Sequence, residues 1–209
     1  MLFESRVNSI DLVMIALSAE FTQVLRFFRP DESSIVVDVG ANIGGYAIRL
    51  ARSAQHVIAI EPEPGNFAQL VSHIELNRLN NVTPLNVAVS DRRGRGVLHI
   101  SQQSGGHSLE TRAWTPGTGI SVDVETILLD DVVERHRLLK IDWLKIDVER
   151  HELAVLNGAD RALSMTRNLI LEFDIAELAG IESLLSRHGL RIRWYDAGSE
   201  NSSLIATTA

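Results

Sequence analysis

From Ile35 onward, short runs of β-branched and aliphatic residues alternate with amphipathic segments whose apolar positions recur at helical spacing. The runs predicted as strands are 35–39, 56–60, 82–89, 97–101, 121–125, 141–146 and 169–173. The segments predicted as helices are 43–54, 66–80, 127–137, 152–163 and 175–188. Such alternation is typical of βαβ units with right-handed crossovers. It predicts an α/β fold on a mostly parallel sheet, which the runs 190–195 and 204–207 close as a hairpin.

The first 30 residues follow a different pattern. Apolar side chains recur at helical spacing from about Phe3 to Phe28, and Pro30 ends the pattern. This predicts an N-terminal helical extension over 1–30, ahead of a main domain over 31–209. The extension either covers one edge of the domain or lies over a pocket, and the sequence leaves both roles open.

Charge and composition exclude several classes of protein. The chain has 20 Lys and Arg against 27 Asp and Glu, a net charge of −7, which argues against a broad nucleic-acid-binding face. The basic cluster at Arg92, Arg93 and Arg95 is interpreted as a solvated turn. There is no Cys, so disulfides, Cys-ligated zinc and a thiol nucleophile are excluded. No apolar run is long enough to span a membrane, and we expect a cytoplasmic protein.

The first candidate site is the loop D-V-G-A-N-I-G-G-Y over 38–46, which joins the first predicted strand to the first predicted helix. Glycines let a ligand approach the backbone, and the helix start offers unpaired N–H groups. Asn42 occupies the place of the middle Gly in the dinucleotide fingerprint, so the loop suits a diphosphate less well. The candidate cofactor-binding residues here are Asp38, Gly40, Ala41, Asn42 and Gly44.

Two further acidic positions extend this candidate site. Glu61 ends the second predicted strand about 20 residues after the glycine loop, where a carboxylate accepts hydrogen bonds from ribose hydroxyls. Asp38 is buried by its position in the first strand. It either ties down N–H groups of the loop or binds an amino group of the ligand.

The run K-I-D-V-E-R-H-E over 145–152 follows a central strand of the predicted sheet. Open α/β sheets bind ligands beyond the carboxyl ends of their strands, and crowded ionisable groups at that edge indicate a site. The alternative is a salt-bridged turn between strand and helix, in which Glu149 favours the helix start through the helix dipole.

The ordered series of these motifs resembles the FkbM-type S-adenosylmethionine-dependent methyltransferases. The resemblance covers about Val36 to Phe173, and it includes I-E-P-E-P at 60–64, A-V-S-D-R-R-G at 88–94 and Leu129-Asp130-Asp131. It implies a Rossmann-like class I methyltransferase fold, with seven strands and helices on both faces. It also implies S-adenosylmethionine as cofactor, S-adenosylhomocysteine as product, and O-methylation of a small molecule, sugar or lipid.

The resemblance assigns a role to each candidate residue. The methionine part of the cofactor is held by Asp38, Gly40, Asn42 and Gly44, and the ribose by Glu61. The adenine is bordered by Ala88, Val89 and Ser90. Asp147 and Glu149 face the reacting centre.

One position departs from the family pattern. Arg150 stands where the family run usually has Gly, which indicates either a special backbone angle or space for an acceptor. Arg150 therefore fills that space, binds an anionic acceptor, or marks reduced activity. It is a poor base, because a guanidinium stays protonated.

A hydroxyl acceptor needs a base as well as alignment with the methyl donor. The candidates for the catalytic residues are Asp147, Glu149, His107 and His151. A divalent metal held by Asp147 with Glu149, Glu172 or Asp174 is an alternative that the sequence does not favour.

The main prediction is a methyltransferase acting on a small-molecule or glycan acceptor, with neither a nucleic acid nor a membrane as partner. Alternatives are a nicotinamide-dependent oxidoreductase on a Rossmann fold and a non-catalytic cofactor-binding module, for which Arg150 is the motive. The acceptor itself depends on the 102–119 loop and the N-terminal helix, and the sequence does not identify it. The oligomeric state is equally unreadable.

Overall fold

The computed structural model describes residues 1–3, 27–103, 105–111, 117–197 and 202–208. The helix predicted over 3–28 lies outside these residues except at its two ends. Within them, the strands of the main sheet stand in the order β3 (Val82–Leu85), β2 (His56–Ile60), β1 (Ile35–Val39), β7 (Ile141–Ile146), β8 (Thr166–Phe173), β10 (Ser202–Thr208) and β9 (Leu190–Ala197). All neighbours are parallel except β10, which runs antiparallel to both β8 and β9. The mostly parallel seven-stranded sheet and its terminal hairpin are thus confirmed.

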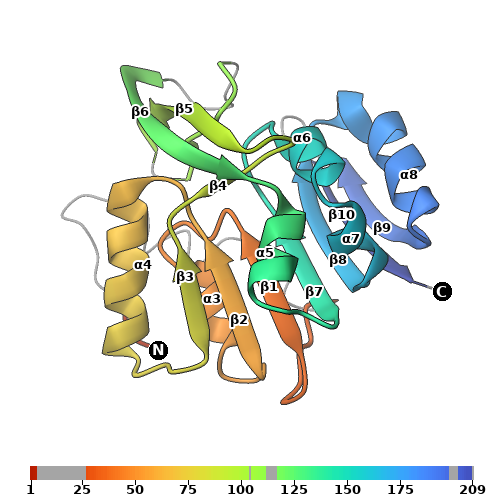
Figure 1. The fold of residues 1–209 in the computed structure, drawn as a ribbon, viewed down its shortest axis with the longest axis horizontal. Coiled ribbons are helices and arrows are strands. Elements are labelled where there is room, and N and C mark those ends of the chain that lie inside the picture. The colour runs from red at the N-terminus through yellow and green to blue at the C-terminus, as the bar shows by residue number, and fades with distance from the viewer. Residues whose placement is uncertain (4–26, 104, 112–116, 198–201, 209) are drawn as a thin grey trace.

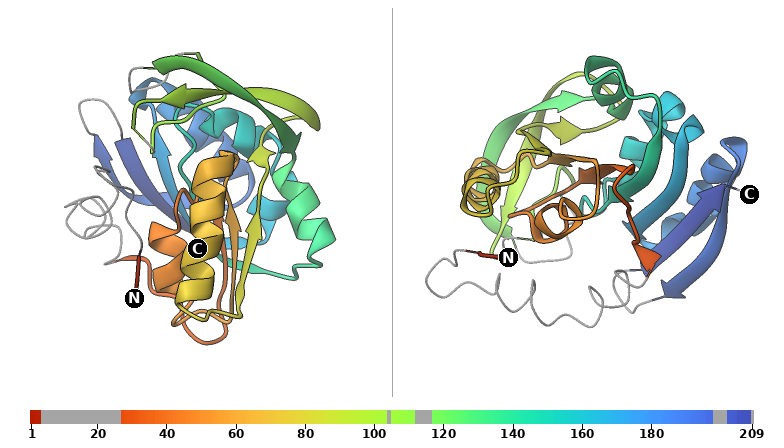
Figure 2. Two further views of the ribbon diagram at one scale, coloured as in Figure 1. Left: turned by 90° about the vertical axis from the view of Figure 1, so that its left-hand side faces the viewer. Right: turned by 90° about the horizontal axis from the view of Figure 1, so that it is seen from below.

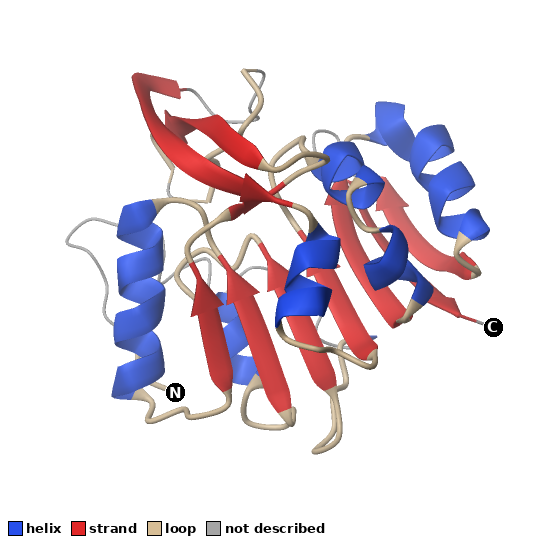
Figure 3. Ribbon diagram, in the orientation of Figure 1, coloured by secondary structure: helices blue, strands red, loops and turns tan. Residues whose placement is uncertain are grey.

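Helices cover both faces of this sheet (Figures 1 and 3). The helices on one face are α3 (Gly45–Leu50) and α4 (Pro64–Leu76), which pack on alternate residues of β1 and β2. Those on the other face are α5 (Leu129–Arg135), α6 (Glu152–Asn157), α7 (Asp160–Ser164) and α8 (Leu178–Arg187), preceded by the short 3-10 helix η1 (Ile175–Glu177). In the part of the chain that the structure describes, no helix is long and apolar enough to cross a membrane.

The prediction of a single strand over 82–89 is wrong. The segment divides into β3 and the two-residue β4 (Ala88–Val89), which belong to different sheets. The turn between them is held by Asn86, whose side-chain amide donates to the carbonyl oxygens of Glu61 and Pro62. The chain therefore leaves the main sheet at the carboxyl end of β2.

The helix predicted over 152–163 is also divided, into α6 and α7. Gly158 stands at the break, where an added Cβ would overlap the carbonyl oxygen of Ser90. This contact requires glycine, and glycine favours the end of a helix. The helix predicted over 43–54 is shorter than expected, because regular hydrogen bonding begins at Gly45 and gives way to turns after Leu50.

A second sheet, in the order β4-β6-β5, contains β5 (Gly94–Ser101) and β6 (Gly117–Ile127). It lies beyond the carboxyl ends of β2 and β3, at the top of the molecule in Figure 1 and in the left view of Figure 2. The strands predicted over 97–101 and 121–125 are both present and longer than expected. This sheet positions the segment 105–111 over the edge where the candidate site residues gather.

Candidate active site

The loop after β1 is shaped by two glycines. Gly40 has φ +80°, and its amide and that of Ala41 donate to the carbonyl oxygen of Ile60 at 3.0 and 2.9 Å. A Cβ on Gly40 would overlap the carbonyl oxygen of Asp147, and one on Gly44, at φ +95°, would lie 2.8 Å from Leu70 Cδ1. Packing against the backbone of another segment thus requires glycine at position 40, a reason that the sequence did not reveal, whereas at position 44 the left-handed backbone angle favours glycine.

Glu61 ties this loop to the end of β2. Its side chain is buried, and its carboxylate accepts hydrogen bonds from the amides of Asn42 at 2.8 Å and Glu63 at 2.9 Å. Burial raises the pKa of the Glu61 carboxyl to about 7, although these two amides act in the opposite direction. A carboxylate in this position titrates near neutral pH.

A buried lysine links the ends of β1 and β7. The Lys145 ammonium lies 3.0 Å from Asp147 Oδ2 and 3.5 Å from Asp38 Oδ1, and 4.9 Å from the centre of the Tyr46 ring. Burial disfavours its charge, but Asp147 and Asp38 outweigh this and raise the pKa of the Lys145 ammonium. Burial also raises the pKa of Asp38, and Lys145 opposes that shift.

Lys145 begins the run singled out over 145–152, but the sequence assigned it no role. One signal was present, because a single lysine interrupts the apolar run of β7. The second signal needs the strand order: Asp38 and Lys145 are register partners across β1 and β7. Only the paired sheet brings the acid and the ammonium together.

The loop after β7 contains two consecutive non-glycine residues with left-handed backbone, Glu149 at φ +54° and Arg150 at φ +75°. The buried Glu152 holds this loop, since its Oε1 accepts from the amides of Val148 at 3.3 Å and Arg150 at 3.1 Å. Burial raises the pKa of Glu152 to about 7. The left-handed angle at 150 explains why glycine suits this position in the family pattern.

Arg150 points its guanidinium toward the end of β8. Its Nη2 atom lies 3.5 Å from Asp174 Oδ2, and both side chains are about one quarter exposed. The pair joins the loops that follow two neighbouring strands of the main sheet.

His151 is engaged through both ring nitrogens. Nδ1 lies 2.9 Å from Glu110 Oε1, and Nε2 lies 3.0 Å from the Ser90 hydroxyl. Glu110 is a residue that the sequence did not single out, because 41 positions separate it from His151.

His107 has a different environment. Its Nδ1 accepts a hydrogen bond from the amide of Ser101 at 3.0 Å. The neutral ring therefore carries its proton on Nε2 and presents a donor there. Ser108, next along the segment, donates from its hydroxyl to the carbonyl oxygen of Glu149.

The structure thus brings most of the predicted site residues to one edge of the sheet. Ala88 and Val89 are buried in β4, and Ser90 reaches this edge through His151. Among the described residues, no group of three or more His, Asp and Glu side chains is arranged to hold a metal ion.

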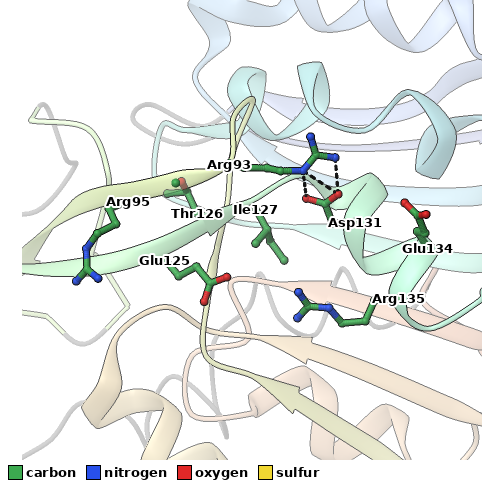
Figure 4. Close-up of a pocket in the computed structure, with 9 residues that line it drawn as sticks. Arg93, Arg95, Glu125, Thr126, Ile127, Asp131, Glu134 and Arg135 are labelled. Carbon is green, nitrogen blue, oxygen red and sulfur yellow. Dashed lines mark hydrogen bonds and ion pairs between the residues drawn. The ribbon is translucent and has the colours of Figure 1, made fainter.

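A separate cleft of about 680 Å³ lies between the second sheet and α5 (Figure 4). Its lining residues are Arg93, Gly94, Arg95, Glu125, Thr126, Ile127, Asp131, Glu134 and Arg135. Arg93 forms a bidentate ion pair with Asp131 at 2.7 to 3.1 Å. None of the predicted site residues lines this cleft.

Comparison with known proteins gives a consistent result. The model of the methyltransferase FkbM domain family matches residues 38–192. The chain is 32% identical to the hexuronic acid methyltransferase AglP of Haloferax volcanii over 68% of this chain and 56% of that protein. It is 28% identical to the 31-O-demethyl-FK506 methyltransferase FkbM of Streptomyces tacrolimicus over 76% of this chain and 73% of that protein.

Among solved structures, the methyltransferase FkbM of Methylobacillus flagellatus KT superposes with a TM-score of 0.59 at 20% identity. The match covers 87% of this chain and 45% of that one. This likeness shows the fold. The chain spans little more than half the length of AglP and less than half that of the solved protein.

Proposed function

The chain belongs to the FkbM methyltransferase family, and we propose that it transfers a methyl group from S-adenosylmethionine to a hydroxyl oxygen of a small molecule, sugar or lipid. One observation carries the proposal: Asp38, Glu61 and Asp147 stand at the carboxyl ends of three neighbouring parallel strands, β1, β2 and β7. That edge of an open α/β sheet is where such folds bind their ligands.

The residues present fit the cofactor. Asp38 is buried, and its Oδ1 lies 3.5 Å from the Lys145 ammonium, but neither carboxylate oxygen completes a hydrogen bond with another described residue. A buried acid of this kind suits the amino group of a ligand. The residues that would hold the methionine part are Asp38, Gly40, Ala41, Asn42 and Gly44. Glu61 would hold the ribose, and the adenine would lie beside Ala88, Val89 and Ser90.

The bound cofactor supplies an activated methyl group on a positively charged sulfur. The protein must align the acceptor with it and remove the hydroxyl proton. We assign the proton to Asp147, because its side chain is 28% exposed at the carboxyl end of β7 and Lys145 fixes its Oδ2 at 3.0 Å. Glu149 is the neighbouring carboxylate. His151 suits this role less well, since both of its ring nitrogens are engaged by protein groups.

Calorimetric titration tests the cofactor. We expect S-adenosylhomocysteine to bind the wild-type protein and NADH not to bind. The reverse result would replace this proposal with a nicotinamide-dependent oxidoreductase.

Turnover tests the chemistry. Methyl transfer is measured over a panel of acceptors that includes hexuronic acids, because AglP is named for such a substrate, together with neutral sugars and phenols. Asp147→Asn should lower turnover by about 10²- to 10⁴-fold and leave S-adenosylhomocysteine affinity within a few fold. Binding of the cofactor without turnover on any acceptor would favour a non-catalytic module.

A further inference from the structure

A chain of hydrogen bonds runs from the segment 105–110 to the region assigned to the adenine. Glu110 Oε1 lies 2.9 Å from His151 Nδ1, and His151 Nε2 lies 3.0 Å from Ser90 Oγ. Positions 90, 110 and 151 belong to three separate parts of the chain: the end of β4, the segment after β5, and the start of α6. This series of hydrogen bonds therefore links three elements that are not joined to one another by backbone hydrogen bonds of a sheet.

The segment 105–110 lies against both loops of the candidate site. At its start, a Cβ on Gly105 would lie 3.5 Å from the side-chain Nδ2 of Asn42, in the loop after β1. In its middle, the Ser108 hydroxyl donates to the carbonyl oxygen of Glu149, in the loop after β7. Ser108 also pairs with His99 of β5 through two backbone hydrogen bonds at 2.8 and 3.2 Å. The segment thus connects the loop after β1, assigned to the cofactor, with the loop after β7, assigned to the acceptor.

The environment of His151 argues against two simpler roles: a general base for the acceptor, and the base that activates a serine nucleophile. Its side chain is 10% exposed, and each ring nitrogen already has a protein partner. Ser90 is 2% exposed, so the Ser90–His151–Glu110 arrangement does not present a nucleophile to a substrate. These hydrogen bonds instead fix the end of the segment 105–110 at Glu110.

We propose that Glu110 and His151 are positioning residues that hold the segment 105–110 as a wall of the acceptor site, and that cofactor bound beside Ser90 strengthens this hold. The inference rests on the proposed function, which places the adenine at Ser90. It implies positive coupling, in which bound cofactor raises the affinity for the acceptor and bound acceptor raises the affinity for the cofactor by the same factor.

Hydrogen exchange of the amides in 105–111 tests the hold without an acceptor. Glu110→Ala should speed their exchange about three- to tenfold, a range that allows for the half-exposed carboxylate of Glu110. Glu110→Gln keeps an acceptor oxygen and should restore most of the protection. Asp160→Ala is the matched control, because Asp160 pairs with His188 at 3.2 Å between α7 and the end of α8. Equal exchange in the Glu110→Ala and wild-type proteins would overturn the proposal.

A second measurement tests the coupling to the cofactor. S-adenosylhomocysteine should slow exchange of 105–111 in the wild-type protein, and His151→Ala and Ser90→Ala should abolish this protection. Protection that persists in both variants would overturn the coupling. Failure of S-adenosylhomocysteine to bind the wild-type protein would refute the proposed function instead, while the Glu110 comparison would still decide the positioning role.

With an acceptor from the turnover panel, kinetics give an independent readout. Glu110→Ala should raise KM for the acceptor about tenfold and leave kcat within about twofold, because the segment binds the acceptor without taking its proton. A loss confined to kcat would contradict a positioning role.

Discussion

The loops that follow β1 and β7 are neighbours, yet they hold their shapes by different means. They meet where the Asp147 amide donates to the carbonyl oxygen of Val39 at 3.1 Å and where Gly40 packs on the Asp147 carbonyl group. The first loop places Gly40 and Gly44 at φ +80° and +95°, and Asn42 at φ +51°. The second places Glu149 and Arg150 at φ +54° and +75°. Left-handed backbone comes easily to glycine and is tolerated by asparagine, whereas it is strained for Glu149 and Arg150.

Each loop is nevertheless held by one buried glutamate. Glu61 accepts a hydrogen bond from the amide of Asn42 in the first loop and another from that of Glu63 after β2. Glu152 accepts from two amides of the second loop, those of Val148 and Arg150. Burial raises both pKa values to about 7. The backbone conformation of the first loop therefore follows from its own residue types, whereas that of the second loop depends on contacts with other parts of the molecule. Substitutions that act on one loop alone test this contrast.

The largest effect is expected at Gly40. Gly40→Ala combines a left-handed backbone with an overlap against the Asp147 carbonyl oxygen, so the free energy of unfolding should fall by more than about 4 kcal/mol. Chemical denaturation measures this loss. Gly189→Ala is the control, since Gly189 has φ +75° but no atom within 4 Å of an added Cβ, and should lose only about 1 kcal/mol. Equal losses would show that the contact between the loops contributes nothing.

The next effect concerns the lysine between the two loops. Lys145→Met leaves Asp38 buried without its ammonium partner and should lower the free energy of unfolding by about 3 kcal/mol at neutral pH. Burial already raises the pKa of Asp38 above its unfolded value, and loss of Lys145 raises it further. The deficit should therefore shrink as the pH falls toward about 4.

Lys140→Met is the matched control for this substitution. Lys140 pairs with Asp142 at 2.8 Å, but its side chain is 47% exposed, so the loss should stay below about 1 kcal/mol. A deficit in Lys145→Met that does not change with pH would contradict the role assigned to Asp38.

The same contrast explains what could be predicted from the sequence. The strands of the main sheet and the residues of the first loop follow from local patterns: β-branched runs, a glycine turn, and an acid 20 residues later. The contacts of Glu110 with His151 and of Lys145 with Asp38 span 41 and more than 100 positions. Such pairings depend on strand order and on the second sheet, neither of which a local pattern contains.

The division of 82–89 shows the same limit. The residues read as one continuous strand, because Val82–Leu85 and Ala88–Val89 both suit extended backbone. What ends the first part is the Asn86 amide, which donates to the carbonyl oxygens of residues 61 and 62. This bond depends on where β2 ends in space.

A smaller effect separates the two buried glutamates. If the ionised Glu61 accepts the ribose hydroxyls, affinity for S-adenosylhomocysteine should rise about tenfold between pH 6 and pH 8, as a carboxyl with pKa about 7 loses its proton. Calorimetry across this range measures the rise. Glu61→Gln should flatten it, whereas Glu152→Gln should preserve it.

Stability should show the opposite dependence on pH. Both pKa values are raised above the ordinary value of 4.5, so each glutamate contributes stability that is lost as the pH rises toward about 7. Glu61→Gln and Glu152→Gln should each make the free energy of unfolding fall less steeply as the pH rises toward about 7. A pH-dependent affinity that disappears in Glu152→Gln and persists in Glu61→Gln would exchange the roles of the two residues.

The smallest effect addresses the strained residue itself. Arg150→Gly and Arg150→Ala both remove the guanidinium and its contact with Asp174, but only glycine suits φ +75°. Arg150→Gly should therefore be more stable than Arg150→Ala by about 1 kcal/mol, the reverse of their usual order in helices and strands. Because the lost ion pair is common to both variants, the difference isolates the backbone. If alanine is as stable as glycine, Glu152 sets the loop without strain, and the family's preference for glycine at this position reflects space for the acceptor.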